Sequence, residues 1–143
     1  MAKMKAILVA VDGSATSDRA VGHAIELMSG GLAGELHLLN VQPNLRGAIS
    51  TFVSREQIDA YHREEGEKGL ASAVALAKAA GIDAKVHIGV GRQGEVVQDF
   101  VAKIGASLVV LGTRGHTGLS SVLLGSVAQD VLAHVKVPVT FVK

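Results

Sequence analysis

Short apolar runs alternate with longer segments of helical period along the chain, and this alternation constrains the fold more than any other feature. Continuous apolar runs such as residues 5–11 (KAILVAV) and 107–111 (SLVVL) are typical of strands buried on both faces. Between such runs apolar residues recur at helical spacing, as Ala20, Val21 and Ala24 do within residues 14–28. Strands and helices in strict turn favour a parallel sheet covered by helices on both faces.

The sequence predicts five strands and four helices in one domain over residues 1–143. The strands are expected at 5–11, 35–41, 84–90, 107–111 and 137–142, and the helices at 14–28, 56–80, 94–104 and 126–135. This order is typical of an open, twisted, mainly parallel and Rossmann-like α/β sheet, in which ligands bind beyond the carboxyl ends of the strands. Pro138 lacks an amide hydrogen, which favours an edge position for the last strand.

Composition excludes several classes of function. Lys and Arg number 14 against 13 Asp and Glu, and no run of like charge stands out, so the electrostatic footprint of a nucleic-acid binder is missing. The absence of cysteine excludes disulfides, zinc–thiolate sites and a cysteine nucleophile. No apolar segment has the length of a membrane span, and Asp12 interrupts the first apolar run too early for a signal peptide. We expect a cytoplasmic protein without membrane insertion.

Two glycine-rich loops are candidates for a phosphate site. The first, GVGRQG at 89–94, fits the dinucleotide pattern G-x-G-x-x-G, but it follows the third predicted strand rather than the first. The position where an acidic residue would bind ribose falls near Arg114, which leaves an NADP site with Arg114 on the 2′-phosphate as one alternative. We favour the other alternative, that Gly91 and Gly94 turn the chain into helix 94–104.

The second loop, GTRGHTGLSSVLLGS at 112–126, has more of the features of an anion site. Gly112 and Gly115 allow the backbone to approach a ligand and to adopt positive φ. Residues 126–129 read S-V-A-Q, a capping-box pattern that predicts Ser126 as the helix cap. The amides and the dipole at a helix start favour an anion, and Arg114 is a natural phosphate partner. On these grounds alone, a phosphate site and a capped surface loop remain equally open.

The spacing G112-x-x-G115-x9-G125-S126 resembles the nucleotide-binding signature of the universal stress protein (UspA-like) family, in its ATP-binding branch. The similarity covers essentially the whole chain, through ILVAVDGS at 7–14, LHLLNVQP at 36–43, ASLVVLGTRG at 106–115 and VKVPVTFV at 135–142. The resemblance implies a fold of the adenine nucleotide alpha hydrolase type and ATP as the ligand, with or without Mg²⁺. The ligand would lie across the ends of the first and fourth strands.

The resemblance also implies a role for each matching residue. Phosphates and ribose would be held by four positions through backbone amides and one hydroxyl: Gly112, Gly115, Gly125 and Ser126. Asp12 would lie near the ribose and any Mg²⁺, and Val127 would add an amide. Ala10, where family members with bound ATP often carry proline, and Val41 would line the adenine pocket. His116 lies in the binding loop, where it either contacts phosphate or faces solvent.

Catalytic constellations are not evident in the sequence. Ser14 and Ser126 have no evident His–Asp partners, the P-loop pattern does not occur, and the histidines at 23, 37 and 87 are spread too widely to be assigned as metal ligands. We therefore expect no catalytic residue and at most weak ATP hydrolysis. A slow ATPase or phosphotransferase, with Asp12 as base or metal ligand, is one alternative, and a nucleotide-free interaction module is another.

The leading hypothesis is a dimeric, nucleotide-dependent sensor or adaptor in the stress response. The apolar strand 137–142 and a mean hydropathy of +0.37 favour a homodimer through that strand. The segment 42–56 has no clear period and is expected to be a loop that becomes ordered on binding, where Arg46 either closes over the triphosphate or is solvated. A regulatory protein partner is expected, and the sequence does not identify it.

Overall fold

A five-stranded sheet forms the centre of the protein in a computed structural model that describes residues 4–45, 52–115 and 123–143. The strands are β1 (Met4–Ala10), β2 (Ala33–Gln42), β3 (Lys85–Val90), β4 (Leu108–Gly112) and β5 (Val139–Val142). They lie in the order β3-β2-β1-β4-β5, and all four pairings are parallel. The parallel α/β fold predicted from the sequence is confirmed, and β5 occupies an edge, as predicted from Pro138.

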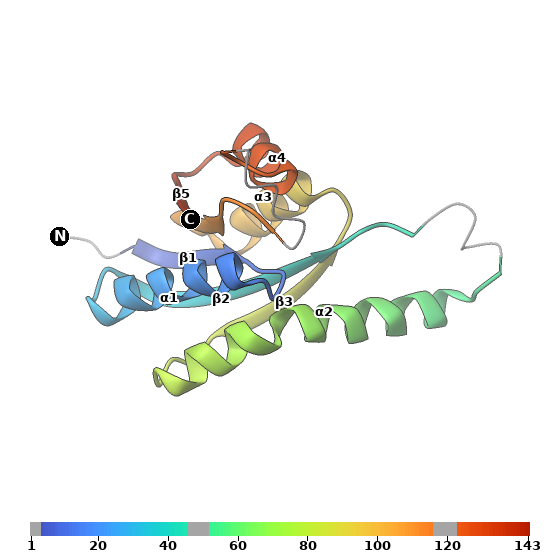
Figure 1. Cartoon of the computed structure of the whole chain (residues 1–143), viewed down its shortest axis with the longest axis horizontal. Coiled ribbons are helices and arrows are strands. Elements are labelled where there is room, and N and C mark those ends of the chain that lie inside the picture. The colour runs from blue at the N-terminus through green and yellow to red at the C-terminus, as the bar shows by residue number, and fades with distance from the viewer. Residues whose placement is uncertain (1–3, 46–51, 116–122) are drawn as a thin grey trace.

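Four helices cover the two faces of this sheet (Figure 1). They are α1 (Ala15–Ser29), α2 (Arg55–Ala79), α3 (Gln93–Ile104) and α4 (Ser126–His134). Helices α1 and α2 pack on one face, and α3 and α4 on the other. Each predicted strand and helix is present with its ends within two residues of the expected position. No helix among the described residues is both long and apolar enough to cross a membrane.

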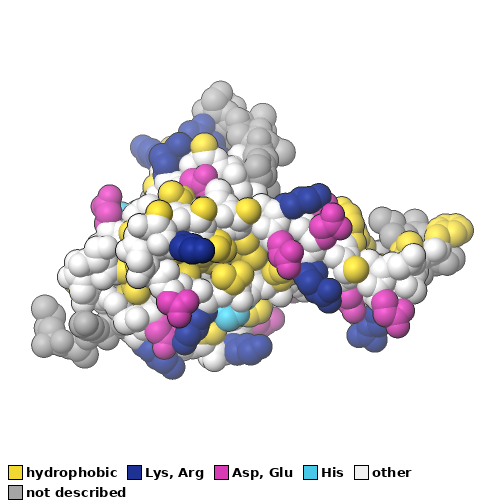
Figure 2. All heavy atoms as spheres, turned by 90° about the horizontal axis from the view of Figure 1, so that it is seen from below, with side chains coloured by type: hydrophobic (Ala, Val, Ile, Leu, Met, Phe, Trp, Pro, Cys, Tyr) yellow, Lys and Arg dark blue, Asp and Glu magenta, His cyan; other side chains and the backbone are white. Residues whose placement is uncertain are grey.

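The central strand β1 is buried on both sides because both helical layers meet it. Ile7 and Val9 point into the cluster beneath α1 and α2, whereas Leu8 and Ala10 point into the cluster beneath α3 and α4. The core is aliphatic, as the small aromatic content predicts. The outer face of α1 and α2 carries Lys and Arg interspersed with Asp and Glu, so no broad surface of one sign of charge is visible there (Figure 2).

Helix α2 approaches the sheet closely because two of its positions are glycine. A Cβ at Gly66 would lie 2.6 Å from Ile88 Cδ1 of β3, and one at Gly69 would overlap Asn40 Nδ2 of β2. Asn40 is buried, and its Nδ2 donates a hydrogen bond of 2.9 Å to the Val11 carbonyl, directly before Asp12. Gly69 therefore leaves room for an amide that positions the end of β1.

His37 and His87 form a cluster on the other face of the sheet, where β2 meets β3. Their rings stack with centroids 5.1 Å apart, and His37 Nδ1 lies 2.8 Å from His87 Nε2. The second ring nitrogen of His37 lies 2.9 Å from Glu35 Oε2, which also pairs with Lys85 at 3.5 Å. Parallel pairing of β2 and β3 thus brings two histidines that lie 50 residues apart in the sequence into direct contact.

The environment of His87 disfavours its charged form. Burial lowers the pKa of His87, and the positive charges of Lys103 and Lys85 and the neighbouring His37 ring lower it further. Phe100 of α3 packs against the same ring. Among the described residues there is no group of three His, Asp or Glu side chains placed to hold a metal ion. The hydrogen bonds of the cluster connect side chains of β2 and β3.

Replacing Gly69 by alanine is expected to destabilise the protein by about 1–3 kcal/mol, because the added methyl group displaces Asn40 from the Val11 carbonyl. Urea unfolding measures the free energy. Gly22→Ala is the matched control: an added Cβ in the middle of α1 meets no atom within 4 Å, so this variant should gain roughly 0.5–1 kcal/mol. Equal unfolding free energies for the Gly69→Ala variant and the wild type would contradict the packing argument.

The free energy of unfolding is expected to fall as the pH drops through the ordinary histidine pKa of 6.5, partly because of His87. The unfolded chain binds the proton first, so stability is lost from that pH downward until folded His87 is also protonated. The His87→Gln variant keeps a donor without titrating, and its unfolding free energy should depend less on pH in this window. The His23→Gln variant, changed on the opposite helical layer, should keep the wild-type slope; identical slopes in all three proteins would refute the assignment.

Candidate functional site

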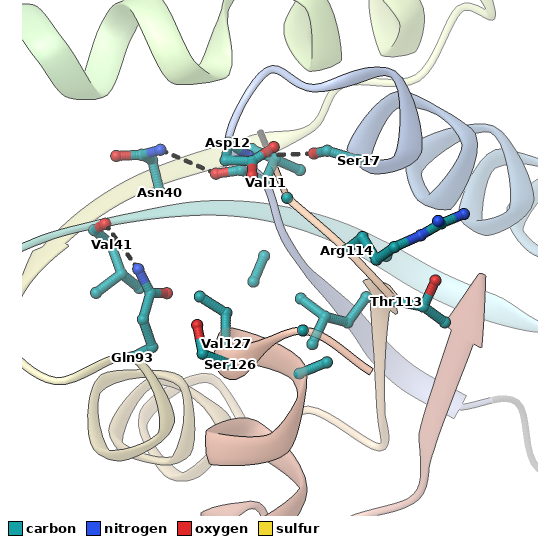
Figure 3. Close-up of a pocket in the computed structure, with 16 residues that line it drawn as sticks. Val11, Asp12, Ser17, Asn40, Val41, Gln93, Thr113, Arg114, Ser126 and Val127 are labelled. Atoms are coloured by element: carbon teal, nitrogen blue, oxygen red, sulfur yellow. Dashed lines mark hydrogen bonds between the residues drawn. The ribbon is translucent and has the colours of Figure 1, made fainter. Parts of the chain in front are cut away.

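A cavity of about 320 Å³ lies beyond the carboxyl ends of β1 and β4 (Figure 3). Nine of the ten residues predicted as nucleotide contacts line it: Ala10, Asp12, Val41, Gly112, Arg114, Gly115, Gly125, Ser126 and Val127. The tenth, His116, lies outside the described residues, as does Arg46. A wider groove of about 850 Å³ shares Gly115, Gly125 and Ser126 with the cavity and continues over α4 and the start of α3. The sheet edge chosen from the sequence therefore does contain a concave site of ligand size.

One wall of the cavity is apolar and comes from the α3/α4 face of the sheet. Ala10, Val41 and Leu111 end three adjacent strands, and Ala128 of α4 faces them. All four side chains are buried within the aliphatic cluster of that face. A small, smooth aliphatic wall of this kind suits a flat apolar group, and alanine at position 10 leaves the wall intact.

The opposite side of the cavity is a polar turn between β1 and α1. Gly13 has φ +83°, a left-handed conformation that glycine accepts readily, and it turns the chain directly after Asp12. The Asp12 carboxylate accepts a hydrogen bond of 2.9 Å from the Ser14 amide, and the Asp12 amide donates one of 3.1 Å to Ser17 Oγ. Ser14 in turn caps α1 by accepting from the Ser17 amide. These bonds hold the Asp12 side chain at the rim of the cavity.

None of the three signature glycines has a positive φ, so backbone conformation does not require glycine at these positions, and space requires it at two of them. A Cβ at Gly112 would lie 2.8 Å from Thr16 Cγ2, so this glycine lets β4 pack against α1. A Cβ at Gly115 would lie 2.7 Å from Asp12 Oδ2, so this glycine lets the loop pass the carboxylate. A Cβ at Gly125 would make only ordinary contact, 3.4 Å from the Thr113 carbonyl. Of the three, Gly125 is the one that the protein's own packing needs least.

The predicted cap of α4 is wrong by one residue. Gly125 is the N-cap, Ser126 is the first helical residue, and no side chain among the described residues caps the helix. The Gly125 amide donates to the Thr113 carbonyl at 2.7 Å, which holds Gly125 in the extended conformation that precedes the helix. The Gln129 side chain donates to the Leu124 carbonyl instead of completing a capping box. The Ser126 hydroxyl therefore lines the cavity without serving as the cap.

The start of α3, by contrast, is already occupied by an anion from the protein itself. The Gly94 amide donates to Asp130 Oδ2 of α4 at 2.7 Å, and Arg92 pairs with the same carboxylate at 3.0 Å. The hydrogen bond from Gly94 is the main cause that lowers the pKa of Asp130, with Arg92 adding to it. A Cβ at Gly94 would overlap the Asp130 carbonyl, so this glycine is needed for the contact between α3 and α4. The structure therefore supports the interpretation of residues 89–94 as a turn into α3.

The side chain of Arg114 points away from the cavity, on the side where α1 lies (Figure 3). A contact between the guanidinium and a phosphate would need another rotamer of this side chain.

Sequence analysis missed four polar residues of the lining, Ser17, Asn40, Gln93 and Thr113, of which Asn40 and Gln93 make informative hydrogen bonds. Asn40 donates to the Val11 carbonyl, and Gln93 Nε2 donates to the Val41 carbonyl at 3.3 Å. Gln93 could have been predicted from its position, because the first residue of a helix that follows a parallel strand lies at the same edge of the sheet as the ends of the other strands. Asn40 lies at a buried strand position, where an amide indicates a specific hydrogen bond.

Comparison with known proteins agrees with this architecture. The model of the universal stress protein family matches residues 3–143. Universal stress protein MJ0531 of Methanocaldococcus jannaschii is 32% identical over 141 residues, which cover 97% of this chain and 82% of that protein. The solved structure of the hypothetical protein MJ0577 superposes with a TM-score of 0.83 at 26% identity, covering 99% of this chain and 97% of that one.

A structure of the universal stress protein from Archaeoglobus fulgidus in complex with dAMP superposes with a TM-score of 0.70 at 25% identity, over the full length of both chains. The match to the family model over nearly every residue, together with the shared fold, identifies this chain as a member of the universal stress protein family.

Proposed function

We propose that this protein binds an adenine nucleotide, ATP above all, in the cavity at the ends of β1 and β4, and that it acts as a nucleotide-dependent sensor or adaptor in the stress response. The observation that carries the proposal is the two-sided lining. An apolar wall faces a polar rim, and the helix start with no side-chain cap, at Gly125 and Ser126, lies between them. A universal stress protein with this fold has been solved with dAMP.

Each part of a nucleotide has a chemically suitable part of the lining. The base would lie on the aliphatic wall of Ala10 and Val41. Phosphates would accept hydrogen bonds from the amides at the start of α4, where the helix dipole favours an anion, and from the Ser126 hydroxyl. Arg114 would add its charge after a change of rotamer.

The ribose would lie beside Asp12, whose carboxylate accepts hydrogen bonds from hydroxyl groups. Asp12 is also the carboxylate of the cavity lining that would ligate Mg²⁺ carried by the phosphates, since Mg²⁺ at nucleotide sites takes one or two carboxylates and completes its shell with phosphate and water. The chemistry of the donor set therefore fits Mg²⁺ that arrives with the nucleotide. Mg²⁺ would supply charge neutralisation of the phosphates there.

Signalling would follow from a difference in affinity between two conformations of the protein. The lining joins Asp12 and Ser17, on the α1 side of the sheet, to the starts of α3 and α4 on the other side, so one bound ligand would contact both helical layers. A ligand that prefers one arrangement of these elements shifts the population toward it and changes the surface offered to a regulatory partner. The segment 42–56 remains a predicted part of this response.

The site assignment is tested by calorimetric titration with MgATP and by mass spectrometry of small molecules released from the purified protein. The Gly125→Val variant should lose roughly tenfold or more in affinity for ATP, because the side chain takes the space of the phosphates at the helix start, and tenfold corresponds to about 1.4 kcal/mol. Gly22→Val, in α1 and away from the cavity, is the matched control and should bind as the wild type does. Wild-type affinity in the Gly125→Val variant, with its fold intact, would reject the site.

We further propose a homodimer that pairs through β5, an edge strand whose side chains are half-buried. The carbonyls of Pro138 and Val142 accept hydrogen bonds from β4, so by alternation the backbone groups of Val139 and Phe141 face the open edge.

A lysine at this edge disfavours pairing, because the twofold axis brings two like charges together. Thr140→Lys is therefore expected to shift the protein to a monomer at micromolar concentration in sedimentation velocity. Val86→Lys, at an exposed position of the opposite edge strand β3, should leave the dimer intact. A wild-type protein that sediments as a monomer would disprove the dimer, and a dimeric Thr140→Lys variant would disprove its location.

A further inference from the structure

Gln93 lies at the end of the cavity formed by β2 and α3, and the protein holds its backbone firmly. It is the first residue of α3 and follows the cap residue Arg92. Arg92 and the amide of Gly94, its two neighbours in the chain, both bind the Asp130 carboxylate of α4. Gln93 is thus placed between two anchored residues, and its side chain enters the cavity from a fixed starting point.

The amide group of Gln93 has a defined orientation. Its Nε2 donates to the Val41 carbonyl at 3.3 Å, and this is the hydrogen bond of the Gln93 side chain found among the described residues. The reverse orientation would place two oxygen atoms against each other, so the Val41 carbonyl determines which end of the amide accepts. Figure 3 shows the nitrogen directed at Val41 and the oxygen directed toward the side of the cavity where Val127 lies.

This orientation leaves an acceptor and a donor side by side for a ligand. An amide nitrogen carries two hydrogens, and the Val41 carbonyl uses one of them. The other lies beside Oε1, so the remaining edge of the group presents an acceptor next to a donor. Adenine offers the complementary pair, an amino group at position 6 and a ring nitrogen next to it, which is why glutamine can pair with adenine through two hydrogen bonds.

A base with an oxygen at position 6 does not match this edge in the same pose. Guanine and hypoxanthine would place that oxygen against Gln93 Oε1, and two acceptors repel each other. Rotating the amide would relieve the repulsion only by breaking the bond to Val41 and turning Oε1 toward the Val41 carbonyl. The loss of binding free energy would concern only the contacts of the base, because the phosphates would be held at the start of α4 by other groups.

We propose that Gln93 is a specificity-determining residue of this site, which selects a 6-amino purine over a 6-oxo purine by pairing with the base while Val41 fixes the direction of its amide. This inference rests on the proposed function, since it requires that an adenine nucleotide occupies the cavity. It adds to that function a residue and a chemical basis for the choice of base.

The experiment compares ATP with ITP, which differ only in the group at position 6 and the protonation of the adjacent ring nitrogen. Calorimetric titration of the wild type should give an affinity for ATP roughly 5- to 100-fold above that for ITP, the range expected of one bidentate pair. In the Gln93→Met variant, which keeps the length of the side chain but neither polar atom, this ratio should fall toward one through loss of affinity for ATP. Gln98→Met, on the same helix with its side chain bonded to the Lys136 amide, is the matched control and should keep the wild-type ratio.

The outcomes of this experiment distinguish the role of Gln93 from the binding of a nucleotide in the cavity. A wild type that binds neither nucleotide overturns both. A wild-type ratio that persists in the Gln93→Met variant, or an equal loss of ATP and ITP, overturns the role of Gln93 and leaves nucleotide binding standing. Gln93→Leu, which also lacks both polar atoms, serves the same comparison if the methionine variant does not fold.

Discussion

The order of the strands creates the site, because the chain turns in opposite directions from β1. It proceeds from β1 to β2 and β3 on one side, then returns to place β4 on the other side. The connections after β1 and β4 therefore lead to helices on opposite faces, α1 below and α4 above, and they diverge instead of packing together. A crevice at this point is a property of the topology. The residues at the ends of the two strands decide only what the crevice holds.

The two glycine loops at this edge differ in what satisfies the helix start that follows each of them. At α3 the Asp130 carboxylate accepts from Gly94 and pairs with Arg92, so the favourable position for an anion is filled from within the chain. At α4 no side chain in the described part of the chain caps the helix, and the extended backbone at Gly125 is held by the Thr113 carbonyl. The Asp130 carboxylate thus fills the anion site at the start of α3 and also holds α3 and α4 together. Gly94, at the start of α3, allows the two helices to pack together. The three signature glycines before α4 line the cavity instead.

The sequence was sufficient for the fold because the signals for its elements are local. Buried parallel strands require continuous apolar runs, and the helices between them show their own period, so the element order and the edge at which ligands bind followed directly. The contacts that cross between elements had no such signal. The pairing of His37 with His87 depends on the register of β2 and β3, and the room that Gly69 makes for Asn40 depends on the position of α2.

The errors at the site have the same origin. The predicted start of the helix at Ser126 is confirmed, but the cap is Gly125, whose amide donates to the Thr113 carbonyl, twelve residues away, and the local capping-box pattern gives no signal for that contact. Gln93 was expected just before the helix at 94–104, whereas it is the first residue of α3, and its side chain lines the cavity because α3 begins at the end of β3, beside Val41 of β2. The local sequence pattern identifies the helix start that could bind an anion. Tertiary contacts determine which side chains line the cavity beside that helix start.

The parts of the lining are joined by a small number of buried polar contacts, and this determines how rigid the site is. The end of β1 is tied to β2 through Asn40 and the Val11 carbonyl, the start of α3 is tied to β2 through Gln93 and the Val41 carbonyl, and α3 is tied to α4 through Asp130. The apolar wall and the helix start of α4 are therefore held at a fixed separation by contacts in the wall of the cavity, at Asn40 and Gln93, and by one behind it, at Asp130. In the proposed binding mode, such a cavity would select ligands by the distance between a flat apolar group and an anion as well as by the chemistry of each. The lining also includes Ser17 of α1, on the other face of the sheet. A ligand that reached from the apolar wall to Asp12 and Ser17 would therefore contact both helical layers, which is what the proposed coupling of nucleotide binding to the protein surface requires.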